Sequence, residues 1–188
     1  MLTPISPVVA VGAMRTTGQP RLHAGELVLR PWNADDVAVV VEAFRDPAIQ
    51  LWNLEGELGE DQAARLIGVW QARWRLETGA SWAVTEQGVV LGRVGLRTVD
   101  LALGIGEVAY WTLPAARRRG VTARAVSELA RWALDDLGLH RLELRHSMAN
   151  VASCRVAGRA GFTAEGVLRS ALLHADGWHD MHIHGLVR

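Results

Sequence analysis

The segment from residue 106 to residue 138 constrains the fold more than any other, because it joins a strand pattern to an amphipathic helix pattern through a short loop. The stretch GEVAYWTLP alternates apolar and polar positions, as a half-buried strand does. After the loop, apolar residues recur at spacings of three and four from Val126 to Leu137, and Gly138 ends the pattern. A strand that leads through a loop into such a helix predicts an α/β fold in which the helix packs on a sheet.

Strand and helix patterns fill the rest of the chain without a repeat or a linker. Short apolar or alternating runs predict strands at 26–32, 81–86, 89–100, 106–114 and 140–146, and a final hairpin within 165–188 that turns at 175–177. Capping residues and periodicity predict helices at 33–47, 60–79 and 150–161 besides the one ending at 138, with residues 48–59 irregular. We expect residues 23–188 to form one α/β domain, with a mixed, mostly antiparallel, twisted sheet of about seven strands and four helices on both faces. Residues 1–22 are expected to form a flexible tail.

The charge balance and the single cysteine restrict the class of protein. Lysine plus arginine and aspartate plus glutamate number 20 each, so the chain has no net charge with which to attract nucleic acid or an anionic membrane. Cys154 is the only cysteine, which excludes an internal disulfide and fits a reducing compartment. No apolar run reaches the roughly 18 residues of a membrane-spanning helix, and the N-terminal segment lacks the basic start of a signal peptide. We therefore expect a cytoplasmic protein without nucleic-acid or membrane partners.

The loop within LPAARRRGVTARAV, residues 113–126, has two interpretations. A glycine before a helix start lets a ligand approach the backbone, and the first N–H groups of the helix attract an anion. Arginines beside Gly120 add charge-assisted hydrogen bonds to phosphate oxygens. A solvated basic loop would carry the same three arginines, and spacing alone does not separate the two.

Three segments in order resemble the GCN5-related N-acetyltransferase (GNAT) superfamily, and within it the RimJ/RimL-like branch. They are GEVAYWTLPAARRRGV, NVASCRVAGRAGF and EGVLRSALLHADGWHDMHIHGLVR, and the resemblance runs from Glu26 to the C-terminus. In that family an Arg/Gln-x-x-Gly-x-Gly/Ala signature holds the pyrophosphate of acetyl-CoA. It maps onto Arg117, Gly120 and Thr122, where threonine replaces the usual small residue, and Arg118 stands where many relatives have glycine. A second motif, Asn-x-x-Ser followed by Gly-Phe, maps onto Asn150, Ser153, Gly161 and Phe162.

The resemblance implies a GNAT-type sheet, acetyl-CoA as co-substrate and a set of residues that bind it. The implied cofactor-binding residues are Trp111, Thr112, Leu113, Arg117, Arg118, Arg119, Gly120, Val121, Thr122, Ala123, Asn150 and Ser153. Backbone N–H groups of the strand before the loop, with Trp111 to Leu113 nearest, are expected to hold the thioester carbonyl, since such a strand splays from its neighbour in relatives.

Acetyl transfer also needs a base for the amine and an acid for the departing thiolate. The resemblance favours Ser153 as the acid, with Tyr110 as the alternative. Ser153 also falls at the third position of a helix capped by Asn150, which suits a small polar residue without any catalytic role.

The identity of the base stays open. Glu107 either draws the amine proton or is an ordinary solvent-facing strand glutamate. RimL-type enzymes place a glutamate on the penultimate strand, and counting from the Gly-Phe pair puts Leu172 there. The base must therefore be another residue or water, and His174, two residues on and facing the same way, is a candidate substitute.

Acceptor contacts are expected from Trp32 and from residues 51–57, which lie in segments that flank the acceptor groove in relatives. Trp52 offers an apolar wall, and Asn53, Glu55 and Glu57 are suited to hold a cationic amine. Most of the eight tryptophans are expected in the core.

The remaining reactive side chains are not expected to form a site. Cys154, on a short helix, is interpreted as a small buried hydrophobe and not as an acyl-carrying nucleophile. The C-terminal hairpin contains His174, His179, His182 and His184. His182 and His184 share a strand face, but no further ligands stand at metal-site spacing, so we expect a polar strand face and no metal.

The sequence therefore predicts an N-acetyltransferase that transfers the acetyl group of acetyl-CoA to a primary amine by direct attack, through a tetrahedral intermediate. The acceptor is the α-amine of a peptide or protein, or the amine of a small molecule. Another acyl donor such as succinyl-CoA, and a non-catalytic acyl-CoA-binding module, are the alternatives. The protein is expected to be a monomer or a homodimer.

Overall fold

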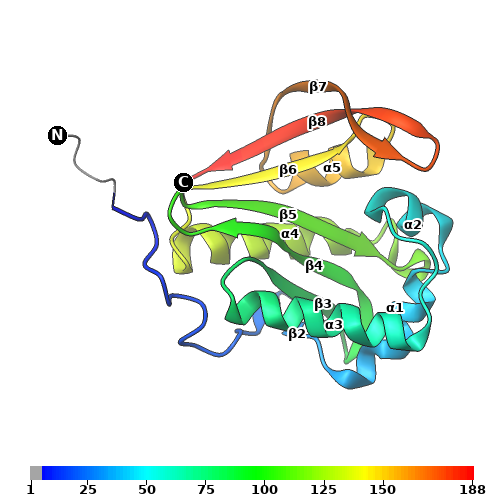
Figure 1. The fold of residues 1–188 in the computed structure, drawn as a ribbon, viewed down its shortest axis with the longest axis horizontal. Coiled ribbons are helices and arrows are strands. Elements are labelled where there is room, and N and C mark those ends of the chain that lie inside the picture. Colours follow the sequence, from blue (N-terminus) through cyan, green and yellow to red (C-terminus); the bar gives the residue numbers. More distant parts are fainter. Residues whose placement is uncertain (1–5) are drawn as a thin grey trace.

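The computed structural model describes residues 6–188 as a mixed sheet with helices on both of its faces (Figure 1). The strands are β1 Leu22–Ala24, β2 Leu27–Pro31, β3 Ala80–Glu86, β4 Val89–Asp100, β5 Ile105–Thr112, β6 Arg141–Ser147, β7 Thr163–His174 and β8 Gly177–Val187. The α-helices are α1 Val37–Ala43, α2 Pro47–Asn53, α3 Glu60–Arg75, α4 Val121–Arg131 and α5 Val151–Arg159, and a π-helical turn, Trp132–Asp136, prolongs α4. Helices α1 and α3 cover one face of the sheet, and α4 and α5 cover the other.

The strand order is β1-β2-β3-β4-β5-β6-β8-β7, and every neighbouring pair is antiparallel except β5 and β6. The parallel pairing of β5 with β6 runs only from Ile105 opposite Arg141 to Val108 opposite Leu144. Beyond Val108 the two strands diverge toward the side where α2 lies (Figure 1). The splay that the family resemblance implies is therefore present, and it opens the sheet along the last four residues of β5.

The predicted fold class is confirmed, with eight strands and five α-helices among the described residues in place of about seven and four. The prediction of an irregular segment at 48–59 was wrong over its first half, because α2 occupies Pro47–Asn53. Asp46 caps this helix by accepting a hydrogen bond from the N–H of Ile49 at 2.9 Å, and Pro47 takes the first helical position. The helix predicted at 33–47 ends at this proline, but proline is also favoured at a helix start.

The segment before β1 packs on the body of the protein over the residues that the structure describes, which differs from the flexible tail expected for residues 1–22. Val9 and Met14 are buried. The carboxylate of Glu77 accepts hydrogen bonds from the N–H groups of Gly12 and Met14, both at 2.8 Å. Burial alone would raise the pKa of Glu77, but these backbone N–H groups outweigh it and hold the pKa below its ordinary value.

The core is divided by the sheet into a larger and a smaller cluster. Residues of α4, such as Val126 and Leu129, contribute to the larger one, and both are fully buried. The smaller one gathers residues of α1, α2 and α3 around Trp32 and Trp111, whose ring centroids are 6.0 Å apart. The expectation that most tryptophans are buried in the core holds for these two, and Trp82 is fully buried as well. Within residues 6–188 the structure has no helix of the length and hydrophobicity required to cross a membrane.

Candidate active site

Strand β5 turns part of its backbone toward the gap between β5 and β6. Leu113, just beyond the end of β5, donates its N–H to the carbonyl of Leu91 at 2.9 Å, on the β4 side. Because backbone groups alternate in direction along a strand, Trp111 also faces β4, while Tyr110 and Thr112 face the gap. We expected the N–H groups of Trp111 to Leu113 to be available there. The N–H groups of Trp111 and Leu113 are not available in the gap, because they face β4 in the antiparallel sheet.

The loop after β5 brings the N terminus of α4 next to this gap. Gly120 has φ +73°, a left-handed conformation that favours glycine, and no side chain caps the first turn of α4. The N–H groups of Val121, Thr122 and Ala123 are thus at the positive end of the helix and suited to an anion. The hydroxyl oxygens of Thr122 and Thr112 lie 2.5 Å apart, so that the start of α4 is hydrogen-bonded to the end of β5.

The three arginines of the loop have different environments. Arg117 donates to Asp46 at 2.6 Å, and this bond holds the pKa of Asp46 below its ordinary value. Arg119 pairs with Glu86. Arg118 is exposed, with φ +64°, and forms no ion pair with the described residues. Two of the three positive charges therefore have carboxylate partners, which argues against an uncompensated basic patch.

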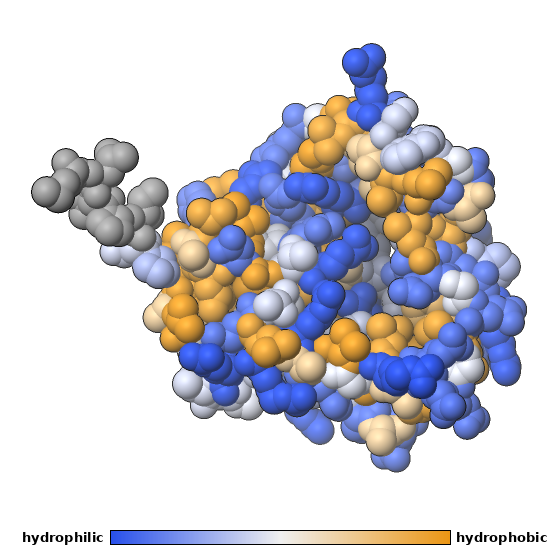
Figure 2. Space-filling view, in the orientation of Figure 1, coloured by the Kyte–Doolittle hydropathy of each residue, from blue (hydrophilic) through white to orange (hydrophobic). Residues whose placement is uncertain are grey.

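A cavity of about 280 Å³ lies where β5 and β6 diverge, and the molecular surface is hollowed there between hydrophilic and hydrophobic residues (Figure 2). Of the residues singled out in the sequence, Trp52, Asn53, Glu107, Tyr110, Asn150, Ser153, Leu172 and His174 line it. The volume is close to the lower end of the range for small-molecule sites, about 300–1,000 Å³. Residues from α2, β5, α5 and β7, far apart in the sequence, thus share one cavity.

Tyr110 and Ser153 supply the hydroxyl groups of the cavity. The N–H of Ser153 is bonded to the Oδ1 atom of Asn150 at 3.1 Å, as expected for an asparagine-capped helix. Burial raises the pKa of Tyr110 to about 12, and the neighbouring Ser153 offsets only part of that effect. The hydroxyl of Tyr110 is buried without a well-oriented hydrogen bond to any described residue. It is therefore a protonated donor at neutral pH that a ligand can satisfy.

His174 is the basic side chain with the most defined geometry. Its Nδ1 atom lies 2.9 Å from the carbonyl oxygen of Leu51, which can only accept, so Nδ1 carries the proton and Nε2 the lone pair. Nε2 is buried and has no hydrogen-bond partner among the described residues. The ring lies against Trp52 and His179, at centroid distances of 5.6 and 4.4 Å. Glu107, the other candidate base, is partly exposed and lies 3.6 Å from Arg97.

The residues expected to contact an acceptor do not all reach the cavity. Trp52 and Asn53, at the end of α2, line it. Trp32 is buried in the smaller core cluster and donates its indole N–H to the hydroxyl of Ser81 at 3.1 Å. Glu55 is exposed and does not line the cavity. The structure thus gives Trp32 a packing role and leaves Glu55 outside the cavity.

Some lining residues were missed by reasoning from the sequence, because β6 and β8 meet only in the folded sheet. Arg145 and His146 from β6 and Met181 from β8 line the cavity. Ser147, at the end of β6, lies 2.6 Å from His179, which in turn lies 2.9 Å from Asp176. No local pattern in the chain indicates these contacts, since they depend on the register of β6 with β8.

A mixed sheet that opens between two parallel strands, with an uncapped helix N terminus beside the opening, defines an acetyltransferase fold. Residues 26–163 match the family described as "Acetyltransferase (GNAT) domain", and the chain belongs to this family.

Relatives and solved structures agree with that assignment. The uncharacterized N-acetyltransferase YoaA of Bacillus subtilis is 24% identical over 172 residues, which cover 90% of this chain and 97% of YoaA. The fold is similar to that of RimL, a ribosomal L7/L12 α-N-protein acetyltransferase solved with coenzyme A, with TM-score 0.83 at 14% identity over 89% of this chain and 98% of RimL. It is also similar to the microcin C7 self-immunity acetyltransferase MccE solved with acetyl-CoA and AMP, with TM-score 0.78 at 19% identity over 87% of this chain and 93% of MccE.

Proposed function

We propose that this acetyltransferase, through a single domain over residues 23–188, transfers the acetyl group of acetyl-CoA to a primary amine that enters the cavity between β5 and β6. The proposal rests on the position of the N terminus of α4. This uncapped helix start is suited to bind phosphate, and it lies next to the gap between β5 and β6 into which the cavity opens. The complexes of RimL with coenzyme A and of MccE with acetyl-CoA support this cofactor.

The N–H groups of Val121 to Ala123 are positioned to receive the pyrophosphate, with Arg118 free to add charge. The gap-facing N–H groups of Tyr110 and Thr112 follow on the same path toward the cavity. In this arrangement the thioester carbonyl accepts from β5, and its oxygen is stabilised there as negative charge develops.

The amine approaches from the side of Trp52 and Asn53. Nε2 of His174 accepts its proton, directly or through water, because this atom holds a lone pair and has no other partner among the described residues. The amine then attacks the thioester carbon, and collapse of the tetrahedral intermediate breaks the carbon–sulfur bond. The hydroxyl of Tyr110 or of Ser153 donates a proton to the sulfur, and this hydroxyl regains a proton from the nitrogen, which loses its extra proton as the amide forms. The family resemblance favours Ser153, and the free, protonated hydroxyl favours Tyr110.

RimL is a ribosomal L7/L12 α-N-protein acetyltransferase, and the present fold resembles that of RimL. We infer that an α-amine, of a peptide or of a small molecule such as an amino-acid derivative, is the acceptor class. The cavity of about 280 Å³ is large enough for the terminal part of such a molecule.

The test combines calorimetric titration of acetyl-CoA with thiol release in the presence of a panel of α-amines and side-chain amines. Gly120→Glu places a carboxylate where the pyrophosphate would lie, at a left-handed φ, and is expected to abolish binding. Arg65→Ala, an exposed arginine on α3, is the matched control and should bind as the wild type does. Binding without thiol release on any amine would identify a non-catalytic acyl-CoA-binding module, and unchanged binding by Gly120→Glu would reject the proposed phosphate site.

A further inference from the structure

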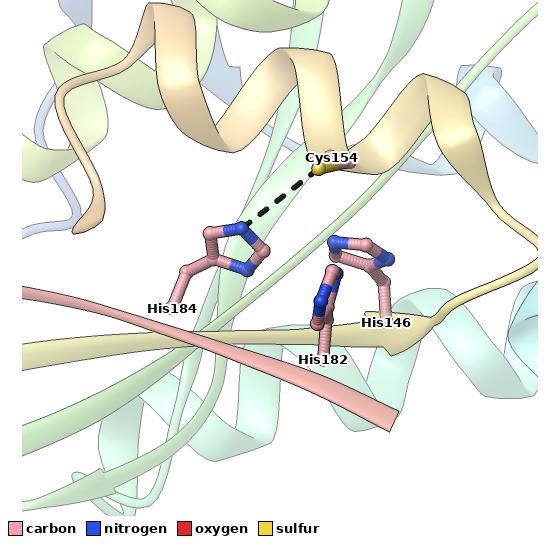
Figure 3. A group of neighbouring side chains, drawn as sticks. All are labelled: His146, Cys154, His182 and His184. Carbon is pink, nitrogen blue, oxygen red and sulfur yellow. Dashed lines mark hydrogen bonds between the residues drawn. The ribbon is translucent and has the colours of Figure 1, made fainter. Parts of the chain in front are cut away.

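Three histidines and the only cysteine converge between α5 and the sheet (Figure 3). His146 comes from β6, His182 and His184 come from β8, and Cys154 comes from α5. One ligand atom of each residue can be chosen so that all four lie within 4.8 Å of one another. The sequence placed only His182 and His184 on one face. The β6–β8 register sets His146 opposite His182, and α5 then supplies the fourth group.

His146 presents one ring nitrogen in the form that binds a metal ion. Nδ1 of His146 lies 2.8 Å from the carbonyl oxygen of Ser147, which fixes its proton there and leaves a lone pair on Nε2. Nε2 of His146 and Nδ1 of His184 are both buried without a hydrogen-bond partner among the described residues. A carbonyl that fixes the second nitrogen is typical of a metal-ligating histidine.

We propose that His146, Cys154, His182 and His184 form a binding site for a borderline transition-metal ion, with Zn²⁺ as the chemical type. Three imidazoles and one thiolate form a donor set that suits Zn²⁺ in tetrahedral geometry. Bonds of about 2.0–2.1 Å to nitrogen and about 2.3 Å to sulfur place tetrahedral ligand atoms roughly 3.3–3.6 Å apart when only one ligand is sulfur. The Sγ atom of Cys154 and Nε2 of His184 are already 4.0 Å apart, and the chosen ligand atoms all lie within 4.8 Å of one another, so closure around an ion shortens the longest separation by at most about 1.5 Å, shared between two side chains.

A bound ion would join α5 to β6 and β8 beside the cavity. Cys154 directly follows Ser153, and His146 lines the cavity itself. The site therefore links the position of α5 to metal occupancy. Metal binding at this site requires neither acetyl-CoA nor an amine, so it can be tested independently of the proposed transfer reaction.

The direct test is Co²⁺ titration of the full chain after removal of metals with a chelator, in a thiol-free reductant. We expect one equivalent to bind, with the visible bands of a tetrahedral site and a thiolate-to-cobalt charge-transfer band, and Zn²⁺ to displace it. Cys154→Ser should lose the charge-transfer band, and His182→Gln should weaken binding by at least about tenfold, since losing a ligand exceeds the loss of an outer-shell partner. His140→Gln, an exposed histidine outside the cluster, should match the wild type.

Thermal unfolding gives a second readout that does not depend on colour. Zn²⁺ at about 100 times its dissociation constant should raise the Tm of the wild type by about 5–10 °C and have a much smaller effect on Cys154→Ser. The metal-free Tm of each variant shows whether the substitution alone has damaged the fold. The proposal is overturned if the wild type binds less than one equivalent of Co²⁺ without a charge-transfer band, or if Cys154→Ser and His182→Gln respond to both ions as the wild type does.

Discussion

Replacement of His174 can separate a positioning role from a role as general base, because Nδ1 would serve the first and Nε2 the second. Nδ1 donates to the carbonyl of Leu51 on α2, at 2.9 Å, while the buried Nε2 faces no partner among the described residues and is assigned to the amine proton. Asparagine places an amide N–H close to the position of Nδ1 and removes Nε2. Glutamine places its amide near Nε2 and loses the bond to Leu51, and neither amide is basic.

A positioned general base contributes about 10²–10⁴-fold to a rate, which is about 3–5 kcal/mol of barrier. We therefore expect both His174→Asn and His174→Gln to lower kcat by about 10²–10⁴-fold while acetyl-CoA binding stays within a factor of about three of the wild type. The neutral hydrogen bond to Leu51 is worth only about 0.5–1.5 kcal/mol, so its loss in the glutamine variant should appear in Tm and in the acceptor KM.

The assay is steady-state thiol release with saturating acetyl-CoA, run beside calorimetric titration of the cofactor. Glu107→Gln is the matched control, and we expect its kcat to fall by less than about tenfold, since a carboxylate beside Arg97 is not assigned the proton. The reasoning fails if His174→Asn keeps more than about a tenth of the wild-type kcat while His174→Gln loses it, because the ring would then serve only to position α2. A large loss in Glu107→Gln alone would move the base to that carboxylate.

Three further outcomes are expected. Tyr110→Phe removes a buried hydroxyl that lacks a partner, so the Tm of this variant should equal or exceed that of the wild type. Its kcat should fall by about 10²-fold if this hydroxyl protonates the thiolate. An unchanged kcat in steady-state thiol release would assign that role to Ser153. Trp52→Ala should raise the acceptor KM and leave acetyl-CoA binding intact, and a KM equal to that of the wild type would remove α2 from the acceptor site. Glu77→Gln should lower the free energy of unfolding at pH 7 by about 1–3 kcal/mol, since it weakens bonds to the N–H groups of Gly12 and Met14. Because the pKa of Glu77 is lowered in the folded state, this stabilisation is present above the unfolded value of about 4.3 and is lost as the pH falls through the folded value, so in chemical denaturation the two proteins should converge in acid.

The strands and the long helices could be predicted because their signals are local. The alternation in residues 89–100 gave the bounds of β4, and the ADG turn gave the β7–β8 hairpin. The segments that were missed have weak or ambiguous local signals. Strand β1 has three residues, and α2 begins at a proline that also suits a helix end.

The site was predictable only in its parts. The glycine before a helix start indicated the proposed phosphate site at Gly120, and the sequence also indicated that Asn150 caps α5. The direction of each N–H along β5 depends on its pairing with β4, and this is why Leu113 was expected to be free. The convergence of His146 and Cys154 on the β8 histidines depends on a strand inserted between β6 and β7, which no spacing along the sequence reveals.

The short parallel contact between β5 and β6 also bears on how the molecule unfolds. Four residue pairs join these strands, against eight pairs between β4 and β5, so the backbone connection between the two sides of the sheet is narrow here. A ligand held by the backbone of β5 on one side and by α5 on the other would bridge that narrow connection. Part of its binding free energy would then go into coupling the two sides, so that saturation with acetyl-CoA should slow amide hydrogen exchange also in the parts of β6 and β8 that do not line the cavity.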